Sequence, residues 1–492
     1  RDLQVMNQQE IYIKVSDWME KHEEDLINDI RRIVAIPSIS NPEDAVPPFG
    51  KECRTALETM LQIGEEHGFY TENYEYYAGS IGCRKKNWDN MIGFWNHLDV
   101  VPVGEGWEYP PFTPTRKGKY LIGRGAQDNK GPAVGILYAM QCIRDLGLPM
   151  KHDLCLFVGC DEERGMEDIA YYTSHYPVPA LSVIADCGFP VCYGEKGILE
   201  CRIISRRKLS GTILEFVGGN AGNIIPDRAR LVLKRDGTDI DKIKKLEDAL
   251  LVKIEDEKIS LTAEGISGHS AFPEGSKNAI CVLSEAVMRS GILTGSDLDI
   301  VDSVHKATAG NYGEEFGISY EDELSGKLTC AGTVLKTDNG NVSLIFNIRY
   351  PITAKADIIM ERLKNYWEVR SFEWELIRNS APNYFNPTHP AVGKLTETFN
   401  ALTGQNTVPY TMGGGTYARK LPNAFGFGIG NMPERKAEEE IFRLRPGQGA
   451  AHGPDEALDC NKLIDAMKIY VMGILSLNDI ELKSGDGHKN GD

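Results

Sequence analysis

The chain has 492 residues, about three times the length expected of one domain, which predicts two or three domains with large cores. Hydrophobic residues make up 41% and charged residues 25%, which excludes a disordered, collagenous or disulfide-scaffold protein. The 54 Lys and Arg against 71 Asp and Glu give a formal net charge of −17, which argues against nucleic-acid and membrane partners.

The 11 cysteines predict a reducing compartment, because they are scattered from Cys53 to Cys460 without a Cys-x-x-Cys pair or a repeated spacing. The N-terminal segment is polar with a helical pattern and does not resemble a secretory signal. The apolar run Ile469–Leu477 is too short to span a membrane. The sequence therefore predicts a cytoplasmic protein.

Strands and helices alternate through the first part of the chain. A helical pattern with Ser16 as a candidate N-cap ends before Pro37, and Pro132 begins a second helix that Gly147 ends. The predicted strands are Met91–Trp95, Leu154–Gly159 and Leu181–Ala185. This alternation indicates a mostly parallel sheet with helices on its faces.

The pattern changes near Ile198 and returns after about Ser380. Short strands and helices fill the interval, and we predict strands at Leu199–Ser205, Ile213–Val217, Ala229–Leu233, Ile259–Glu264 and Val342–Ile348, with helices at Asp239–Ile254 and from Asn278. A strand at Ala424–Ile429 and a helix at Asn461–Leu475 follow. We therefore predict an α/β catalytic domain, with a mixed, mostly parallel sheet flanked by helices, at residues 1–197 and 383–492. An inserted α+β lid domain would occupy residues 198–382.

Acidic and imidazole side chains follow several of the predicted strands. In open α/β sheets the carboxyl ends of the strands meet at one crevice, where ligands bind. Each residue alone has a structural explanation as a cap, a surface charge or a buried histidine, but structural roles do not explain their shared position. The residues are His97, Glu162, Glu163 and Asp186 after strands, Asp128 in a glycine-rich loop, and His452 in a second loop.

Three segments carry a family resemblance: Asn96–Pro102, Gly123–Pro132 and Gly159–Glu163. They resemble, in order, motifs of the co-catalytic zinc metallopeptidases that include aminoacylase, carboxypeptidase G, carnosinase and the PepV-type bacterial dipeptidases. The segments that bring the chain nearest to the PepV-type group are Asp186–Pro190, Gly194–Gly197 and Asn347–Pro351, and Gly413–Tyr417 and the His452 segment agree.

The resemblance implies a site for two divalent metal ions. His97 and Asp186 would bind one ion, Glu163 and His452 the other, and Asp128 both. Imidazole and carboxylate ligands suit zinc, although manganese and cobalt also accept them. Paired cations acidify a shared water and stabilise a developing oxyanion.

Two further acidic residues have roles by the same resemblance. Asp99 would orient the His97 ring by accepting its second N–H, and Glu162 would be the general base that moves a proton from water to the leaving amine. A cis peptide bond is expected between Asp128 and Asn129.

The lid would supply the substrate contacts. His269 resembles the family histidine that stabilises the tetrahedral intermediate, and Arg349 resembles the arginine that binds the C-terminal carboxylate of the substrate. Asn223 resembles another substrate-binding residue, and the backbone of Gly414 and Gly415 could approach the same carboxylate.

The resemblance thus implies a monomeric dizinc dipeptidase that hydrolyses dipeptides or short peptides with a free C-terminal carboxylate, using a hydroxide that bridges the metals and Glu162 as the base. A deacylase of N-acyl amino acids would need the same ligands and remains an alternative. A non-catalytic binding protein would have lost ligands or the base. A phosphoesterase would need a cationic pocket, whereas Arg349 is the one arginine that a motif places near the site.

Overall fold

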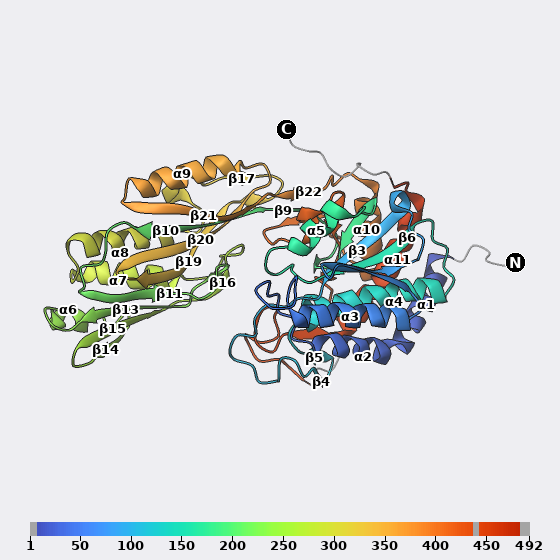
Figure 1. The fold of residues 1–492 in the computed structure, drawn as a ribbon, viewed down its shortest axis with the longest axis horizontal. Helices are drawn as coiled ribbons and strands as arrows, with labels where there is room; N and C mark the ends of the chain where they lie inside the picture. Colours follow the sequence, from blue (N-terminus) through green and yellow to red (C-terminus); the bar gives the residue numbers. More distant parts are fainter. Residues whose placement is uncertain (1–6, 436–441, 483–492) are drawn as a thin grey trace. The chain divides into compact units, whose positions relative to one another are not determined.

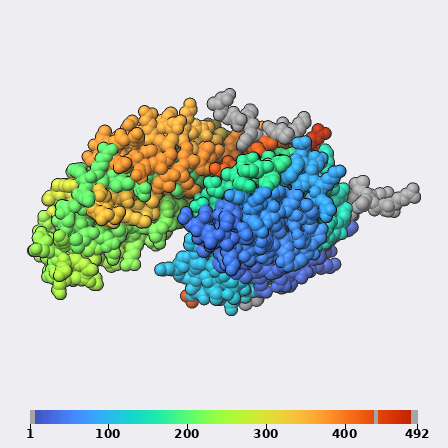
Figure 2. All heavy atoms as spheres, in the orientation of Figure 1, coloured from blue at the N-terminus to red at the C-terminus, as the bar shows by residue number. Residues whose placement is uncertain are grey.

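The computed structural model describes residues 7–435 and 442–482. The chain forms two compact units (Figure 1). Unit 1 contains Arg1–Tyr193, Tyr384–Tyr410 and Thr416–Asp492, and unit 2 contains Gly194–Asn383 and Thr411–Gly415. Figure 2 shows that the visible surface of unit 1 comes mainly from the blue and teal first part of the chain, and that of unit 2 from the green to orange middle part. The division predicted from the sequence differs in placing residues 194–197, 383 and 411–415 in the catalytic domain.

The centre of the unit 1 sheet is parallel, as expected. Strands β6, β3, β7 and β24 run parallel to one another, and the strands beside them are antiparallel. The mixed α/β architecture predicted from the sequence is therefore confirmed. The nine-stranded sheet has the order β1 (Tyr70–Tyr74), β2 (Ala78–Gly82), β6 (Asp153–Gly159), β3 (Met91–His97), β7 (Leu181–Ile184), β24 (Ala424–Gly426), β9 (Cys192–Glu195) and β22 (Asn383–Tyr384), and β23 (Tyr410–Met412) pairs with β9.

Helices cover both faces of this sheet because successive side chains of its buried strands point to opposite sides. On β3, Ile92 and Phe94 join the core formed with α4 and α11, whereas Met91 and Trp95 pack with Tyr172 of α5. The helices of unit 1 are α1 (Gln8–Lys21), α2 (Glu23–Val34), α3 (Lys51–Glu66), α4 (Gly131–Asp145), α5 (Glu167–His175), α10 (Pro390–Thr403) and α11 (Cys460–Ser476).

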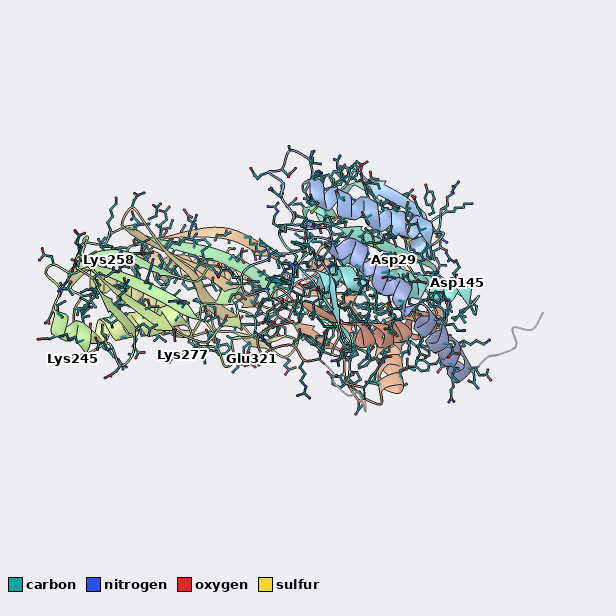
Figure 3. The ribbon with its side chains drawn as sticks, turned by 90° about the horizontal axis from the view of Figure 1, so that it is seen from below. Asp29, Asp145, Lys245, Lys258, Lys277 and Glu321 are labelled. Carbon is teal, nitrogen blue, oxygen red and sulfur yellow. The ribbon has the colours of Figure 1, made fainter. Side chains whose placement is uncertain are left out.

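A buried carboxylate joins α2 and α4 to the residue that follows α3. Asp29 of α2, labelled in Figure 3, accepts hydrogen bonds from His67 at 2.7 Å, Tyr138 at 2.8 Å and Arg32 at 3.0 Å. These contacts outweigh the burial of Asp29 and lower the pKa of its carboxyl. The network fixes α2 and α4 beside each other, and α4 begins directly after Asp128 and its neighbours.

Unit 2 contains an antiparallel sheet and four helices, α6 (Ile240–Lys244), α7 (Ala279–Ser290), α8 (Gly295–Thr308) and α9 (Ala356–Glu368). Its apolar strand residues and the buried sides of the longer helices form a core separate from that of unit 1. The eight strands have the order β14 (Leu251–Ile254), β15 (Lys258–Glu264), β13 (Arg228–Lys234), β11 (Ile213–Gly218), β19 (Thr329–Asp338), β20 (Asn341–Tyr350), β10 (Gly197–Ser205) and β21 (Phe372–Ser380).

Three predicted elements were wrong. The helix expected at Asp239–Ile254 ends at Lys244, and its last four residues form β14, which pairs with β15. Asn7, not Ser16, caps the first helix. The strand expected at Ala424–Ile429 is divided, because the chain turns at Gly428, whose φ is +70°, before the short strand β25 (Ile429–Gly430).

All eleven cysteines are free thiols. Among the described residues, no helix has both the length and the apolar character that a bilayer span requires.

Candidate active site

The register of three parallel strands brings the first site residues together. His97 ends β3 and lies opposite Gly159, the last residue of β6, which leads into the turn carrying Glu162 and Glu163. On its other side β3 pairs with β7, and Asp186 follows that strand by two residues. The side chains at these strand ends therefore share one edge of the sheet.

A buried glutamate joins the two loops that carry Asp128 and His452. Glu456 accepts the backbone N–H of Gln127 at 3.1 Å and that of Asp128 at 2.9 Å. Its second carboxylate oxygen lies 2.8 Å from Arg124, and both side chains are 1% exposed. Glu456 therefore holds the turn of Asp128 against the segment that follows His452.

The two imidazoles lie on either side of one carboxylate. Nε2 of His97 is 3.0 Å from Oδ1 of Asp128, and Nε2 of His452 is 3.0 Å from Oδ2 of the same side chain. Asp186 lies 3.6 Å from His97, and Glu163 lies 2.8 Å from His452. We call the whole set the acid–histidine cluster: His97, Asp128, Glu162, Glu163, Asp186 and His452.

These distances fit the spacing of ligands around metal ions. Ligand bonds of about 2 Å place two ligand atoms of one tetrahedral ion about 3.3 Å apart. Of the four distances within the cluster, three are shorter than this value and one is longer. The distances from His97 form one set and those from His452 form a second, and Asp128 belongs to both sets. Glu162 also lies within reach, with Oε2 at 3.8 Å from His97 Nε2, so distance alone does not distinguish a base from a ligand at this position.

The carboxylate of Asp99 has a second, structural role that the sequence did not indicate. Its carboxylate accepts the backbone N–H of Glu162 at 3.1 Å and that of Glu163 at 3.0 Å, which fixes the turn that carries both side chains. Nδ1 of His97 lies 2.9 Å from the backbone carbonyl oxygen of Asp99 and 3.4 Å from its carboxylate. The shorter contact that orients the ring is therefore to the carbonyl.

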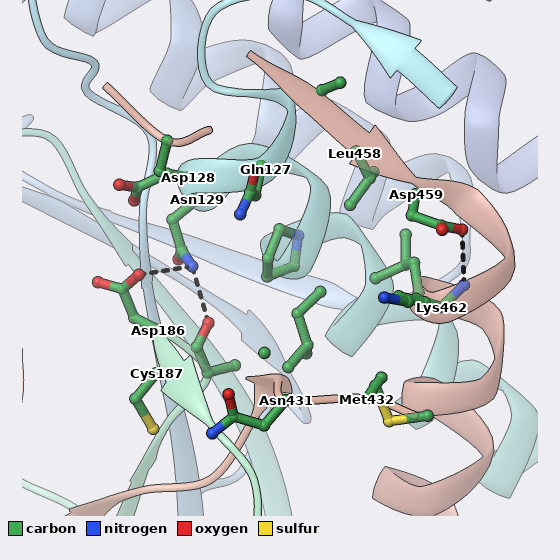
Figure 4. Close-up of a pocket in the computed structure, with 17 residues that line it drawn as sticks. Gln127, Asp128, Asn129, Asp186, Cys187, Asn431, Met432, Leu458, Asp459 and Lys462 are labelled. Carbon is green, nitrogen blue, oxygen red and sulfur yellow. Dashed lines mark hydrogen bonds between the residues drawn. The ribbon is translucent and has the colours of Figure 1, made fainter. Parts of the chain in front are cut away.

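Asn129 is a second positioning residue that the motifs did not reveal. Its side-chain oxygen accepts a hydrogen bond from the backbone N–H of His97 at 3.2 Å. Its side-chain NH2 group donates to the carbonyl of Ala185 at 2.7 Å and to the carboxylate of Asp186 at 3.2 Å (Figure 4). It thereby joins the ends of β3 and β7 to the turn of Asp128. The cis peptide bond expected between Asp128 and Asn129 is present.

Protonation in the cluster reflects how strongly its charges interact. Burial opposes the charged form, yet the hydrogen bonds with Asp128 raise the pKa of His97 well above its ordinary value and that of His452 to about 11. The same imidazoles lower the pKa of Asp128 despite its burial. Burial, reinforced by neighbouring carboxylates, raises the pKa of Glu162 and of Asp186 well above the ordinary range. The concentrated negative charge and the donor types suit divalent cations.

A family model for peptidase family M20/M25/M40 matches residues 93–475, a segment that includes every member of the cluster. The chain belongs to this family. The resemblance seen in the motifs is therefore confirmed, and the protein is a peptidase by its family.

Relatives match this peptidase along nearly its whole length. "Putative dipeptidase YtjP" of Bacillus subtilis is 28% identical over 471 residues, which cover 93% of this chain and 98% of that protein. A Staphylococcus aureus relative with the same description is 29% identical over 481 residues, with 94% and 99% covered. Human carnosine dipeptidase 1 shares the fold, with a TM-score of 0.60 at 15% identity over 96% of this chain and 99% of that chain.

The predicted substrate-binding residues of the peptidase lie together in unit 2. The short strands β12 (Ile224–Ile225) and β16 (Gly268–His269) pair, which places His269 opposite Ile224. The N–H of Ser270 donates to the carbonyl of Asn223 at 2.9 Å. Arg349 donates from Nη1 to the carbonyl of Gly413 at 3.0 Å, directly before Gly414 and Gly415.

Asn347 connects these residues, a role that sequence reasoning missed. Its side-chain oxygen Oδ1 accepts hydrogen bonds from Ser270 Oγ and from Arg349 Nε, both at 2.8 Å. Its amide donates to Glu200 at 2.8 Å, and Glu200 in turn lies 3.0 Å from Arg378. Asn347 and Arg349 are on the same side of β20, two residues apart, which is the one signal that could have identified the pair.

Replacing Arg124 with Met is expected to lower the free energy of unfolding by about 3–5 kcal/mol, because the charge of Glu456 would stay buried without its partner. Urea denaturation measures the change. A matched control is Arg202→Met, which breaks the exposed pair with Glu375 and should cost at most about 1 kcal/mol. Equal losses in the two variants would show that the buried pair has no special role.

Proposed function

We propose that this peptidase is a dimetal dipeptidase that cleaves dipeptides and short peptides with a free C-terminal carboxylate. One observation carries the proposal: the two oxygens of Asp128 each lie 3.0 Å from Nε2 of a different histidine. A carboxylate between two imidazoles, each with a further acid beside it, is the arrangement that a pair of ions sharing one ligand requires. Zinc is the proposed metal, and manganese or cobalt would also suit these ligands.

The cluster would divide its work between binding and proton transfer. His97 and Asp186 would hold one ion, Glu163 and His452 the second, and Asp128 both. When bound, such ions polarise water and the scissile carbonyl group. Glu162 would accept a proton from the attacking water and deliver it to the leaving amine. The buried, acid-rich surroundings that raise the pKa of its carboxyl favour its acceptance of a proton.

In unit 2, Arg349 would bind the C-terminal carboxylate of the substrate, because its planar guanidinium offers paired donors to such a group. Its contacts with Asn347 and Gly413 hold the side chain in one orientation. His269 would stabilise the oxyanion that develops on the substrate, and Asn223 and the backbone of Gly414 and Gly415 would complete the contacts.

Elemental analysis combined with a dipeptide panel, assayed with and without a chelator, tests the proposal. We expect two metal ions per chain and release of free amino acids that stops on chelation and returns when the metal is restored. Each dipeptide is paired with its N-acetylated form. Preference for the acetylated compounds would make the protein a deacylase, and cleavage of phosphate esters without cleavage of peptides would make it a phosphoesterase.

Replacing Asn347 with Leu is expected to raise KM for a dipeptide about tenfold, because Arg349 would lose the acceptor that orients it. Steady-state kinetics measures the change, with Ser343→Ala on the same strand as the control. With a dipeptide amide, which has no carboxylate for Arg349, the variant and the wild type should differ little. An equal loss on both substrates would indicate a purely structural role.

A further inference from the structure

A cavity of about 490 Å³ lies beside Asp128 and Asp186, entirely within unit 1 (Figure 4). Its volume falls within the range of small-molecule sites. Several parts of the chain form its walls: the turn of Asp128 with the start of α4, the segments that follow β7 and β24, Ala451, β26 (Ala457–Asp459) and the beginning of α11. Pro132, Ile429, Met432, Leu458 and Leu463 supply much of the apolar wall.

The charged residues farthest from Asp186 in Figure 4 are Asp459 and Lys462, and both have partners. The carboxylate of Asp459 accepts the backbone N–H of Lys462 at 3.1 Å and lies 3.0 Å from Lys119. The ammonium group of Lys462 donates a hydrogen bond to the carboxylate of Glu434. Because these charges are already paired within the protein, the end of the cavity at Asp459 and Lys462 does not require a charged ligand.

The position of Glu162 indicates which half of a substrate the cavity would receive. A base that returns its proton to the leaving amine must lie on the side of that amine. The cavity is lined by Asp128 and Asp186 but not by Glu162. The leaving group therefore belongs on the side of Glu162, and the half of the substrate that carries the attacked carbonyl belongs beside the cavity.

We infer that this cavity receives the side chain of the amino-terminal residue of the substrate and selects long aliphatic or aromatic side chains. This inference rests on the proposed function. Apolar walls favour such side chains through the area that they remove from water. A small side chain leaves the cavity largely unfilled, and an acidic one would have to bury its charge against the apolar walls. Met432 is the adjustable wall, because it is unbranched, only partly buried and placed across the cavity from Asp128 (Figure 4).

The test compares kcat/KM for Phe-Ala, Ala-Ala and Asp-Ala. We expect wild-type enzyme to prefer Phe-Ala over each of the other two by at least about tenfold. Met432→Trp, which fills the cavity, should lower kcat/KM for Phe-Ala by at least about tenfold and change that for Ala-Ala less than about threefold. Met432→Ala, which enlarges the cavity, should retain the preference for Phe-Ala and extend it to Trp-Ala.

The control is Ala401→Leu, which adds bulk at an exposed position of α10 in a different groove, lined also by α1 and the end of α11. This variant should leave unchanged the ratio of kcat/KM for Phe-Ala to kcat/KM for Ala-Ala. Cleavage of all three dipeptides at similar rates, or a ratio that neither Met432 variant shifts, overturns the inference while leaving the proposed function intact. Failure to cleave any peptide with the metal restored overturns both.

Discussion

The variant Glu162→Gln is expected to lower kcat by about 100- to 10,000-fold while the protein keeps its metal. Gln has nearly the shape of Glu but cannot accept a proton from water and pass it to an amine. The side chain is 7% exposed, so a substitution of equal size avoids a cavity. Because the proposed ligands of the two ions are other side chains, His97, Asp128, Glu163, Asp186 and His452, we expect no ligand to be lost.

The measurements are kcat on a dipeptide and metal content by elemental analysis, made on the same preparation. Glu167→Gln is the matched control, since this exposed residue begins α5 a few positions later and should leave both values unchanged. Loss of one metal ion from Glu162→Gln would mean that Glu162 is a ligand, and the roles of Glu162 and Glu163 would then be exchanged. Full activity would exclude proton transfer by this side chain.

The strand ends that carry the cluster could be predicted because a parallel sheet aligns them. His97, Glu162 and Asp186 each follow or end a run of apolar residues, and the register of β3 with β6 and β7 leaves them at one edge. The strand pattern did not predict that His452 joins this edge, because His452 lies in a loop far along the chain. Its place in the cluster was expected from the motif resemblance alone.

The residues that hold the cluster in place were not predictable in the same way. Glu456 and Asn129 act by hydrogen bonds to atoms that are distant in sequence, so no local spacing marks them. A buried polar residue must find partners, but the sequence does not name the partners. Asp99 was expected to orient the His97 ring, whereas its hydrogen bonds to the turn of Glu162 and Glu163 depend on the packing of β3 against β6 and could not be expected.

The failed helix at Asp239–Ile254 shows where periodicity alone is insufficient. Apolar residues at helical spacing continue through this segment, but a short run can also form a strand. Val252 and Ile254, which are β-branched, pair with β15 as an edge strand, and this tertiary pairing outweighs the local preference.

The variant Asp128→Asn is expected to lose metal as well as activity, because one side chain would serve both ions. The amide keeps the size of the carboxylate but loses the negative charge and one of the two oxygens that face the imidazoles. Removal of a residue that only supports a ligand costs up to about 100-fold in metal affinity, so loss of a shared ligand should cost more than about 100-fold.

Metal content after dialysis, the affinity for added metal and kcat on a dipeptide are the measurements, with a thermal melt to establish that the variant is folded. Asp145→Asn is the control, since this exposed carboxylate, labelled in Figure 3, ends the same helix that begins after Asp128. It should retain two ions and full activity. If folded Asp128→Asn binds two ions as tightly as the wild type, His97 and His452 serve sites that share no ligand, and the bridging role of Asp128 is wrong.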